Sequence, residues 1–368
     1  SDLIDVLVSS WSVQLSATRE GTPIGTADPL NEPTARTDGG ERLNLGDSLL
    51  FYIPPHWRYG TVELRVTVTL NDADPSNNVY TETVTFQHAS PLNVQLVPVQ
   101  IHEQGDRSRP AWTWWPDFSD RTREQTEDIM QYVERLHPIP TLNYRYPSGT
   151  SDAIGPGWPS AWDLSTDQGW SRVVNRLARY DTFTKDWAHN LHYMAMVHPI
   201  LDSGGIGGKG RRPGQYAAAR MSYARDTARP WRIAGGGTMA HELGHNAGLM
   251  HMLCRGDEPD GGNVDPDWPH PDPNCRLATL DPEGYYGFDT YFDAFNGLSL
   301  ANPTVISNDP EGRWSGIDDR HESFPLMGYE RPRWISPYEY CLLLEAYGSN
   351  CDTSAIGPLS LDETHVFE

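Results

Sequence analysis

Three histidines and one glutamate fall within one short run of this chain, which reads His241-Glu242-Leu243-Gly244-His245-Asn246-Ala247-Gly248-Leu249-Met250-His251. On a helix, His241 and His245 lie one turn apart on the same face, with Glu242 beside them. Gly248 allows the backbone to leave the helix with a positive φ, and this turn brings His251 toward the other imidazoles. Three neutral imidazoles leave one position of a tetrahedral Zn²⁺ open for water, so the run predicts a catalytic zinc site rather than a surface helix with coincidental histidines.

Length and charge narrow the class of protein. At 368 residues the chain is long enough for two domains, and its hydrophobic fraction of 38% is that of an ordinary globular protein. The formal net charge is −22 at pH 7, which disfavours nucleic acids and anionic membranes as partners because phosphate groups would be repelled. No run of apolar residues is long enough to cross a bilayer, so we expect no membrane insertion.

The four cysteines all lie in the last third of the chain, at Cys254, Cys275, Cys341 and Cys351. None forms a Cys-x-x-Cys pair, which disfavours a structural zinc knuckle. Three connectivities are open, of which short-range closure favours Cys254–Cys275 and Cys341–Cys351; four free buried thiols are the alternative. Two disulfides imply an oxidising compartment, so we expect a secreted, extracellular protein. The chain begins at Ser1 with no apolar leader, and we expect its signal peptide to have been removed.

Residues 1–90 have the pattern of a small antiparallel β-sandwich. Residues 62–68 alternate strictly between apolar and polar side chains, and the turn-rich segment 71–78 leads into another strand-like stretch. Strand-like stretches separated by turn-rich segments occur at 3–8, 11–17, 48–53, 61–70 and 79–86. The pattern resembles the Ig-like modules of secreted bacterial proteins, and this resemblance implies an N-terminal all-β sandwich.

Residues 91–368 are expected to form a second domain that combines helices with strands. Residues 119–136 and 170–180 carry apolar side chains at helical spacing. The glycine run at 204–210 lacks the phosphate-loop pattern, so we expect an edge strand that exposes its backbone to an extended ligand. Residues 252–325 are rich in Pro, Gly, Asp and Asn, which predicts a long irregular region. Further strands are expected at 92–101, 191–197 and 216–223.

A second motif follows the histidine run. Residues 323–329 read Ser-Phe-Pro-Leu-Met-Gly-Tyr, and Ser336 is placed to cap a C-terminal helix. The two motifs, in this order, resemble the metzincin clan of zinc endopeptidases, in which the histidine run is followed by a Met-turn. The resemblance implies an α/β (α+β) zincin catalytic domain with an irregular C-terminal subdomain, and it places Met327 beneath the zinc ligands. An ordinary core methionine is the alternative for Met327.

The resemblance also implies the roles of the site residues. Zn²⁺ would bind His241, His245 and His251, lower the pKa of a bound water and polarise the scissile carbonyl. Glu242 would accept the proton of that water and pass it to the leaving amine. Tyr329 matches a tyrosine that astacin-like and serralysin-like members place near the metal, where it would ligate zinc at rest and hydrogen-bond the oxyanion. A packed aromatic side chain is the alternative for Tyr329.

Two further features bear on the subfamily and on a second metal. Asn246 resembles the reprolysin and pappalysin branches, whereas Met252 stands where reprolysins typically carry Asp. The acidic loop at 257–267 has a density of oxygen ligands that suits Ca²⁺, although its spacing is not that of an EF-hand. A solvated turn-forming loop is the alternative. The predicted calcium ligands are Asp257, Asp260, Asp265 and Asp267.

Together these patterns predict a secreted, monomeric zinc endopeptidase that hydrolyses peptide bonds in extracellular proteins or glycoproteins. The substrate would lie extended along the edge strand near residues 204–208. One alternative is a catalytically weak or inactive metzincin scaffold that acts as an adhesion module, but Glu242 argues against it because loss of this base is the usual route to an inactive copy. A different zinc hydrolase or amidase is disfavoured by the Met-turn candidate.

Overall fold

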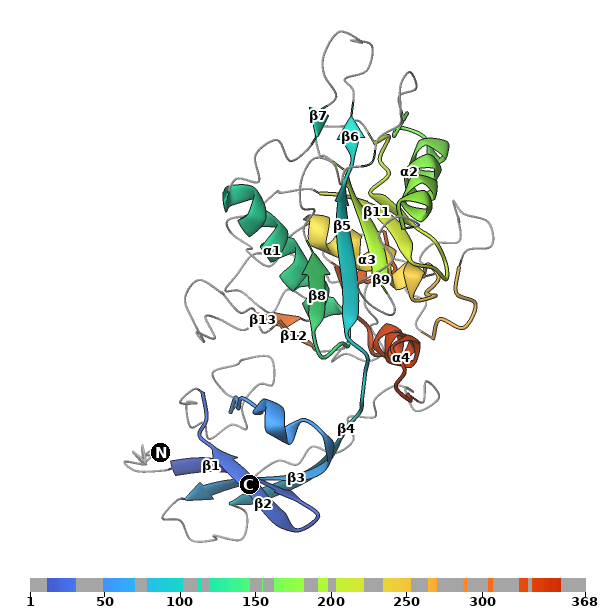
Figure 1. Ribbon diagram of the computed structural model, residues 1–368. Coiled ribbons are helices and arrows are strands. Elements are labelled where there is room, and N and C mark those ends of the chain that lie inside the picture. Colours follow the sequence, from blue (N-terminus) through green and yellow to red (C-terminus); the bar gives the residue numbers. More distant parts are fainter. Residues whose placement is uncertain are drawn as a thin grey trace, which may run out of the picture. The chain divides into compact units, whose positions relative to one another are not determined.

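In the computed structural model the chain divides into two compact units, one built mainly from residues 1–88 and the other from residues 89–289 and 306–358. The residues that the structure describes form four α-helices and several β-sheets, which makes this an α+β protein with a β-rich N-terminal region (Figure 1). The structure describes residues 12–30, 49–69, 78–101, 112–113, 120–145, 154, 162–181, 191–197, 203–221, 234–252, 264–269, 287–289, 304–306, 324–329 and 333–351.

The N-terminal unit contains a four-stranded antiparallel sheet in the order β2-β1-β3-β4. A short 3₁₀ helix at Pro55–Trp57 places the Trp57 side chain in a small core with Leu15, Ala17 and Val62. Between residues 12 and 86 the described residues form this one sheet, so they show a β-rich module and not a complete sandwich. The strands are β1 (Ser12–Arg19), β2 (Thr22–Ala27), β3 (Gly60–Thr69) and β4 (Val79–Phe86).

Three of the predicted N-terminal strands are confirmed as β1, β3 and β4, and two details were wrong. β2 lies where turn residues were expected, because an edge strand tolerates Pro23 and Gly25. Residues 49–53 form no strand; the Leu50 carbonyl instead accepts a hydrogen bond from the Leu30 amide at 2.7 Å. The stretch 3–8 lies outside the described residues.

The larger unit is organised around a five-stranded sheet in the order β10-β11-β9-β5-β8. The last four strands are parallel, and β10 pairs antiparallel with β11 at one edge. The glycine-rich segment thus forms the predicted edge strand, although it is shorter than expected. The strands are β5 (Leu92–Pro98), β8 (Leu142–Arg145), β9 (Leu191–Val197), β10 (Gly208–Gly210) and β11 (Tyr216–Arg220).

Alternation along the strands gives the sheet two buried faces. Met194 and Met196 of β9 belong to a core with α1, α3 and α4, whereas Tyr193 and Ala195 belong to a second core with α2. In Figure 1, α2 accordingly lies apart from α1 and α3. Both predicted helices are confirmed, as α1 and α2, and α3 carries the histidine motif. The helices are α1 (Asp120–Leu136), α2 (Asp167–Asp181), α3 (Ala234–Asn246) and α4 (Pro337–Ala346).

The remaining strands have only two or three residues each, so the described parts of 252–325 are as irregular as predicted. In the part of the chain that the structure describes, no helix has the length and hydrophobicity needed to cross a bilayer. The short strands are β6 (Gln100–Ile101), β7 (Trp112–Thr113), β12 (Gly287–Asp289), β13 (Thr304–Ile306), β14 (Phe324–Pro325) and β15 (Arg333–Trp334).

Candidate metal centre

Three imidazoles converge at the end of α3. His241 and His245 lie one turn apart on the helix, and Gly248, with φ of +105°, turns the chain so that His251 faces them. One ring nitrogen of each histidine lies within 4.8 Å of the other two, and the Nε2 atoms of His245 and His251 are 2.9 Å apart. Among the described residues, no other cluster of three or more His, Cys, Asp or Glu side chains could hold a metal ion.

Backbone carbonyls fix the tautomers of the two helix-borne histidines. Nδ1–H of His241 donates to the carbonyl of Leu326 at 2.8 Å, and Nδ1–H of His245 donates to that of Leu249 at 2.9 Å. Each bond leaves the Nε2 lone pair for a metal and orients the ring, as the outer partners of metal-bound histidines do. The donor set therefore fits a divalent cation that accepts imidazole ligands.

Burial keeps these histidines neutral. Removal from water lowers the pKa of His241 well below its ordinary value, and the nearby charges of Arg333 and the other histidines lower it further. Burial likewise lowers the pKa of His245 to about 4. Because a metal binds only the neutral imidazole, protons would compete weakly with a metal at neutral pH.

The third histidine lies on an irregular segment and is positioned by its backbone. His251 forms an isolated parallel bridge with Val264, and the amide of Asp265 donates to the His251 carbonyl at 2.8 Å. The Asp265 carboxylate accepts hydrogen bonds from the Asp267 amide at 3.0 Å and from the Tyr338 hydroxyl of α4 at 3.1 Å. The segment that carries His251 is thus tied to α4.

Met327 packs against the helix that carries His241 and His245, and its role as a Met-turn stays a prediction. Its side chain is fully buried, and a Cβ placed on Gly244, between His241 and His245, would lie 2.7 Å from the Met327 sulfur. Met252, the residue that follows His251, is also buried in this core among apolar neighbours. The methionine and the motif helix are therefore in close contact.

Glu339 of α4, which was not among the residues predicted from the sequence, fixes the backbone of this methionine segment. Its carboxylate accepts hydrogen bonds from the amides of Met327 at 2.7 Å, Leu326 at 3.2 Å and Ser336 at 2.8 Å. The Ser336 side chain accepts in turn from the Glu339 amide, which completes a capping box. Since the Leu326 carbonyl orients His241, Glu339 acts on the metal centre through the backbone. The Ser-x-x-Glu spacing was the signal that could have revealed it.

Glu242 is buried against the edge strand β10. Ideal Cβ atoms on Gly208 and Gly210 would lie 2.6 Å from the Glu242 side-chain Oε1 and backbone carbonyl oxygen respectively, so both positions exclude a side chain. Burial raises the pKa of Glu242 to about 8, although Arg333, Lys209 and a hydrogen bond from the Gly210 amide act in the opposite direction. The carboxyl group is thus able to exchange a proton near neutral pH.

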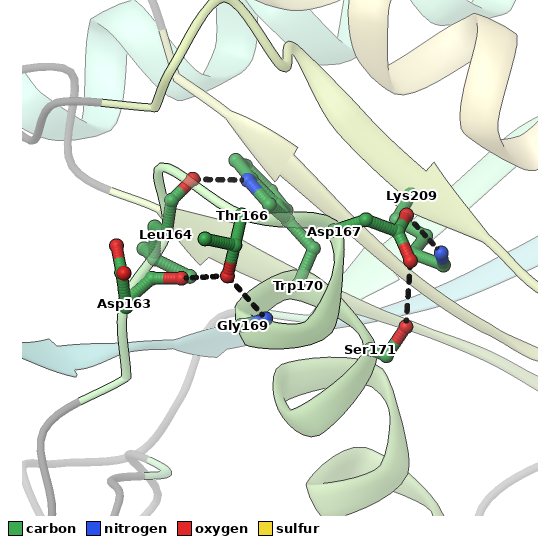
Figure 2. Close-up of polar contacts among 8 residues, drawn as sticks. All are labelled: Asp163, Leu164, Thr166, Asp167, Gly169, Trp170, Ser171 and Lys209. Atoms are coloured by element: carbon green, nitrogen blue, oxygen red, sulfur yellow. Dashed lines mark hydrogen bonds and ion pairs between the residues drawn. The ribbon is translucent and has the colours of Figure 1, made fainter.

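Polar contacts at the start of α2 hold β10 in place (Figure 2). The Lys209 ammonium of β10 forms an ion pair with Asp167 of α2. Thr166 caps the helix by accepting from the Gly169 amide at 3.2 Å, and the Trp170 indole N–H donates to the Leu164 carbonyl at 2.8 Å. The strand that borders Glu242 is thereby anchored to a capped helix.

Tyr329 lies next to the third histidine. Its hydroxyl is 3.0 Å from Nδ1 of His251, and the two ring centroids are 4.7 Å apart. With 51% of its surface exposed, the side chain borders the site from the solvent side. Its role at the metal stays a prediction.

Arg333 is a second residue that the sequence did not reveal. Its buried guanidinium donates from Nε to the Gly328 carbonyl at 2.9 Å and from Nη1 to the Gly237 carbonyl of α3 at 3.2 Å. These bonds connect the segment after Met327 to the motif helix. No sequence pattern predicts such a contact, because it depends on how segments that are far apart in the sequence pack in the fold.

The predicted disulfides and calcium ligands are only partly covered by the structure. Cys341 and Cys351 form a disulfide with a Cα–Cα distance of 5.3 Å, as predicted. Of the predicted calcium ligands, the structure describes Asp265 and Asp267. Both carboxylate oxygens of Asp265 accept hydrogen bonds from the protein, and Asp267 belongs to no metal-binding cluster within the described residues. Calcium binding therefore stays a prediction. The other four predicted positions lie outside the described residues: Cys254, Cys275, Asp257 and Asp260.

No known protein family matches the chain, and no curated protein matches it in sequence. What the site can do therefore follows from its own geometry. Three imidazoles can hold a metal, the buried Glu242 follows His241 on the same helix, and the half-exposed Tyr329 phenol contacts His251. This set can bind a metal, exchange a proton and donate a hydrogen bond.

Proposed function

We propose that the protein is a zinc endopeptidase of the metzincin type. The observation that carries the proposal is the convergence of three imidazoles beside a buried glutamate, with a methionine beneath them and an edge strand alongside. A structural zinc site would use a fourth protein ligand, whereas the described residues supply three. The proposal includes the metzincin fold for the larger unit and an Ig-like sandwich for the N-terminal unit.

The chain supplies the groups that peptide hydrolysis needs. A zinc ion bound by three imidazoles supplies a water of lowered pKa and polarises the scissile carbonyl. Glu242 accepts a proton from the attacking water and donates it to the leaving amine, so one carboxyl group serves as general base and then as general acid. The Tyr329 hydroxyl donates a hydrogen bond to the oxyanion of the tetrahedral intermediate.

The substrate is an extended segment of an extracellular protein or glycoprotein. β10 lies at the edge of the sheet and against Glu242, so a peptide that adds to this edge as a further strand passes the catalytic carboxyl. The Cys341–Cys351 disulfide supports an oxidising, extracellular location for a monomeric enzyme.

Replacement of the proposed base tests the function. The Glu242→Ala variant should bind zinc with the stoichiometry of the wild type and lose about 10²- to 10⁴-fold in kcat/KM on an unfolded protein substrate. Glu345→Ala, which removes an exposed carboxylate from α4, is the matched control and should retain full activity. Metal content, circular dichroism and cleavage followed by mass spectrometry are the measurements. If the zinc-loaded wild type cleaves neither proteins nor glycoproteins, or if Glu242→Ala cleaves equally well, the proposal fails.

A further inference from the structure

The hairpin beside the metal centre is basic in an acidic chain. Residues 203–221, here called the basic hairpin, contain Lys209, Arg211, Arg212 and Arg220 but no Asp or Glu, although the whole chain has a net charge of −22. They include β10, the connecting turn and β11. A local positive field of this kind attracts anionic groups to the surface that carries it.

The turn of this hairpin is fixed next to the second histidine. The Gly214 amide donates to the Asn246 carbonyl at 3.0 Å, at the end of α3. In the amide orientation that satisfies both of its polar atoms, the Asn246 side chain donates to the carbonyls of Arg211 at 2.9 Å and Tyr216 at 3.1 Å. The backbone on both sides of Arg212 is therefore anchored on the residue that follows His245.

Three of the four cations in the hairpin are engaged within the protein. Lys209 pairs with Asp167 (Figure 2), and the Arg211 guanidinium donates to the Asn175 side chain at 2.6 Å. Arg220 lies 3.5 Å from the Ser203 hydroxyl. These contacts leave Arg212 as the member of the hairpin to consider for a ligand.

Arg212 differs from its neighbours. Its Nη1 is buried and has no hydrogen-bond partner among the described residues, although the side chain as a whole keeps part of its surface exposed. Arg212 lies in the turn whose backbone is anchored on Asn246, the residue that follows His245. A buried guanidinium nitrogen without an acceptor is unfavourable, and the planar fork of the group matches a carboxylate.

We propose that Arg212 binds a carboxylate of the substrate close to the scissile bond and makes the site selective for acidic substrates. This inference rests on the proposed peptidase function and names the substrate class of the same site. A carboxylate can come from an Asp or Glu side chain or from a sialic acid on a glycoprotein, and the fork of Arg212 suits both. The basic hairpin supplies attraction at a distance, and Arg212 supplies the specific contact.

Matched peptides test the selectivity. In a fluorogenic series, Glu or Gln is placed in turn at each position on both sides of the cleaved bond. The zinc-loaded wild type should prefer Glu over Gln by about 10- to 100-fold in kcat/KM at one position, the range of a hydrogen bond to a charged group. Arg212→Gln should abolish this ratio, and Arg212→Lys should restore only part of it because a lysine cannot bind bidentately. Arg211→Gln removes the same charge from the adjacent residue and should keep the ratio.

Several outcomes would overturn the inference. A Glu-to-Gln ratio near one in the wild type, together with equal cleavage of sialylated and desialylated glycopeptides, would do so, as would a wild-type preference that is unchanged in Arg212→Gln or equally lost in Arg211→Gln. Circular dichroism and zinc content of each variant show whether it is folded, and a merely structural role of Arg212 would lower cleavage of both peptides together. A sialylated glycopeptide, compared with its desialylated form, identifies which source of carboxylate is bound.

Binding separates this inference from the proposed function. If the zinc-loaded wild type cleaves no peptide, the function fails whatever Arg212 does. Fluorescence anisotropy of labelled Glu and Gln peptides on the Glu242→Ala protein then still measures anion selectivity. Tighter binding of the Glu peptide that disappears in the Glu242→Ala/Arg212→Gln protein supports the anion site alone. Equal binding of the two peptides, together with equal binding of sialylated and desialylated glycopeptides, would overturn it.

Discussion

The two sides of the metal centre are built in different ways. His241 and His245 project from one helix whose residues 235–246 are all buried, and their rings are oriented by backbone carbonyls. His251 lies beyond a glycine turn, where its backbone forms a bridge to Val264 and the next amide, of Met252, donates to the Met327 carbonyl at 3.4 Å. The helix side is therefore preorganised by regular structure, whereas the loop side depends on a few long-range hydrogen bonds. The difference implies that the helix side contributes most of the metal affinity.

Loss of a ligand from each side gives the largest expected effect. His245→Gln should weaken zinc binding by about 10³-fold, because each ligand shares in the roughly 10–16 kcal/mol with which structural zinc sites bind. His251→Gln should weaken it less, since it leaves the two helix ligands in their relative positions. Competition with a chromogenic chelator measures both affinities. An equal loss, or a larger one for His251→Gln, would mean that the loop side is as preorganised as the helix side.

The buried His137, whose ring contacts the Ala240 carbonyl of α3, gives the next largest expected effect, a change of stability with pH. Burial lowers the pKa of His137 to about 4; its Nε2 contacts the Ala240 carbonyl at 3.1 Å, and its Nδ1 accepts from the Tyr347 hydroxyl at 2.6 Å. The neutral His137 ring contributes fully to the stability of the fold above pH 6.5, the ordinary pKa that applies in the unfolded chain. This contribution is lost as the pH falls toward 4, because the unfolded chain binds a proton at a higher pH than the folded protein does. The contribution is on the order of 3 kcal/mol. Chemical denaturation of chelator-treated protein should therefore show a weaker loss of stability toward acid in His137→Gln than in the wild type.

A control separates titration from the hydrogen bond. Tyr347→Phe removes the same bond but keeps the imidazole, so it should lower stability at every pH and preserve the acid-dependent loss. If His137→Gln keeps the wild-type pH profile between pH 4 and 6.5, the anchor does not titrate as described.

The first turn of α4 reaches both sides, and Glu339→Gln tests its link to the helix side. An amide cannot accept all of the hydrogen bonds that the carboxylate accepts from Leu326, Met327 and Ser336. Since the Leu326 carbonyl orients His241, zinc affinity should fall about 10- to 100-fold, the usual effect of outer partners. Glu345→Gln, on the exposed face of the same helix, should leave affinity unchanged. Cobalt substitution provides a second readout, because a displaced His241 alters the visible spectrum of the bound ion.

The comparison also explains which parts of the site could be predicted from the sequence. His241, Glu242 and His245 are set by helical periodicity, and Gly248 by the backbone conformation that its turn requires, so local rules were sufficient. The α1 and α2 helices and β9 followed from apolar spacing in the same way.

The remaining contacts depend on topology. Glu339 and Arg333 act on the centre only because the chain brings α4 and β15 back to the region of α3. No local sequence pattern predicts contacts between segments that lie so far apart in the chain. β2 was not predicted because an edge strand pairs on one side only and so tolerates Pro23 and Gly25. Sequence reasoning was therefore strongest for residues set by local periodicity and turn conformation, and weakest for contacts between segments far apart in the chain.

The turn at Gly248 gives the smallest expected effect and isolates the loop side. Its φ is +105°, and a Cβ at this position would meet no atom within 4 Å, so Gly248→Ala introduces backbone strain without a steric clash. Stability should fall by about 1–2 kcal/mol in thermal denaturation. Zinc affinity should fall by a smaller factor than in Glu339→Gln, because only His251 is displaced. Gly248→Asn should lose less stability, since asparagine adopts positive φ more readily than alanine. If Ala and Asn at this position behave alike, or if either weakens zinc binding as much as His251→Gln, the turn does more than redirect the chain, and the loop side must be regarded as a rigid part of the centre.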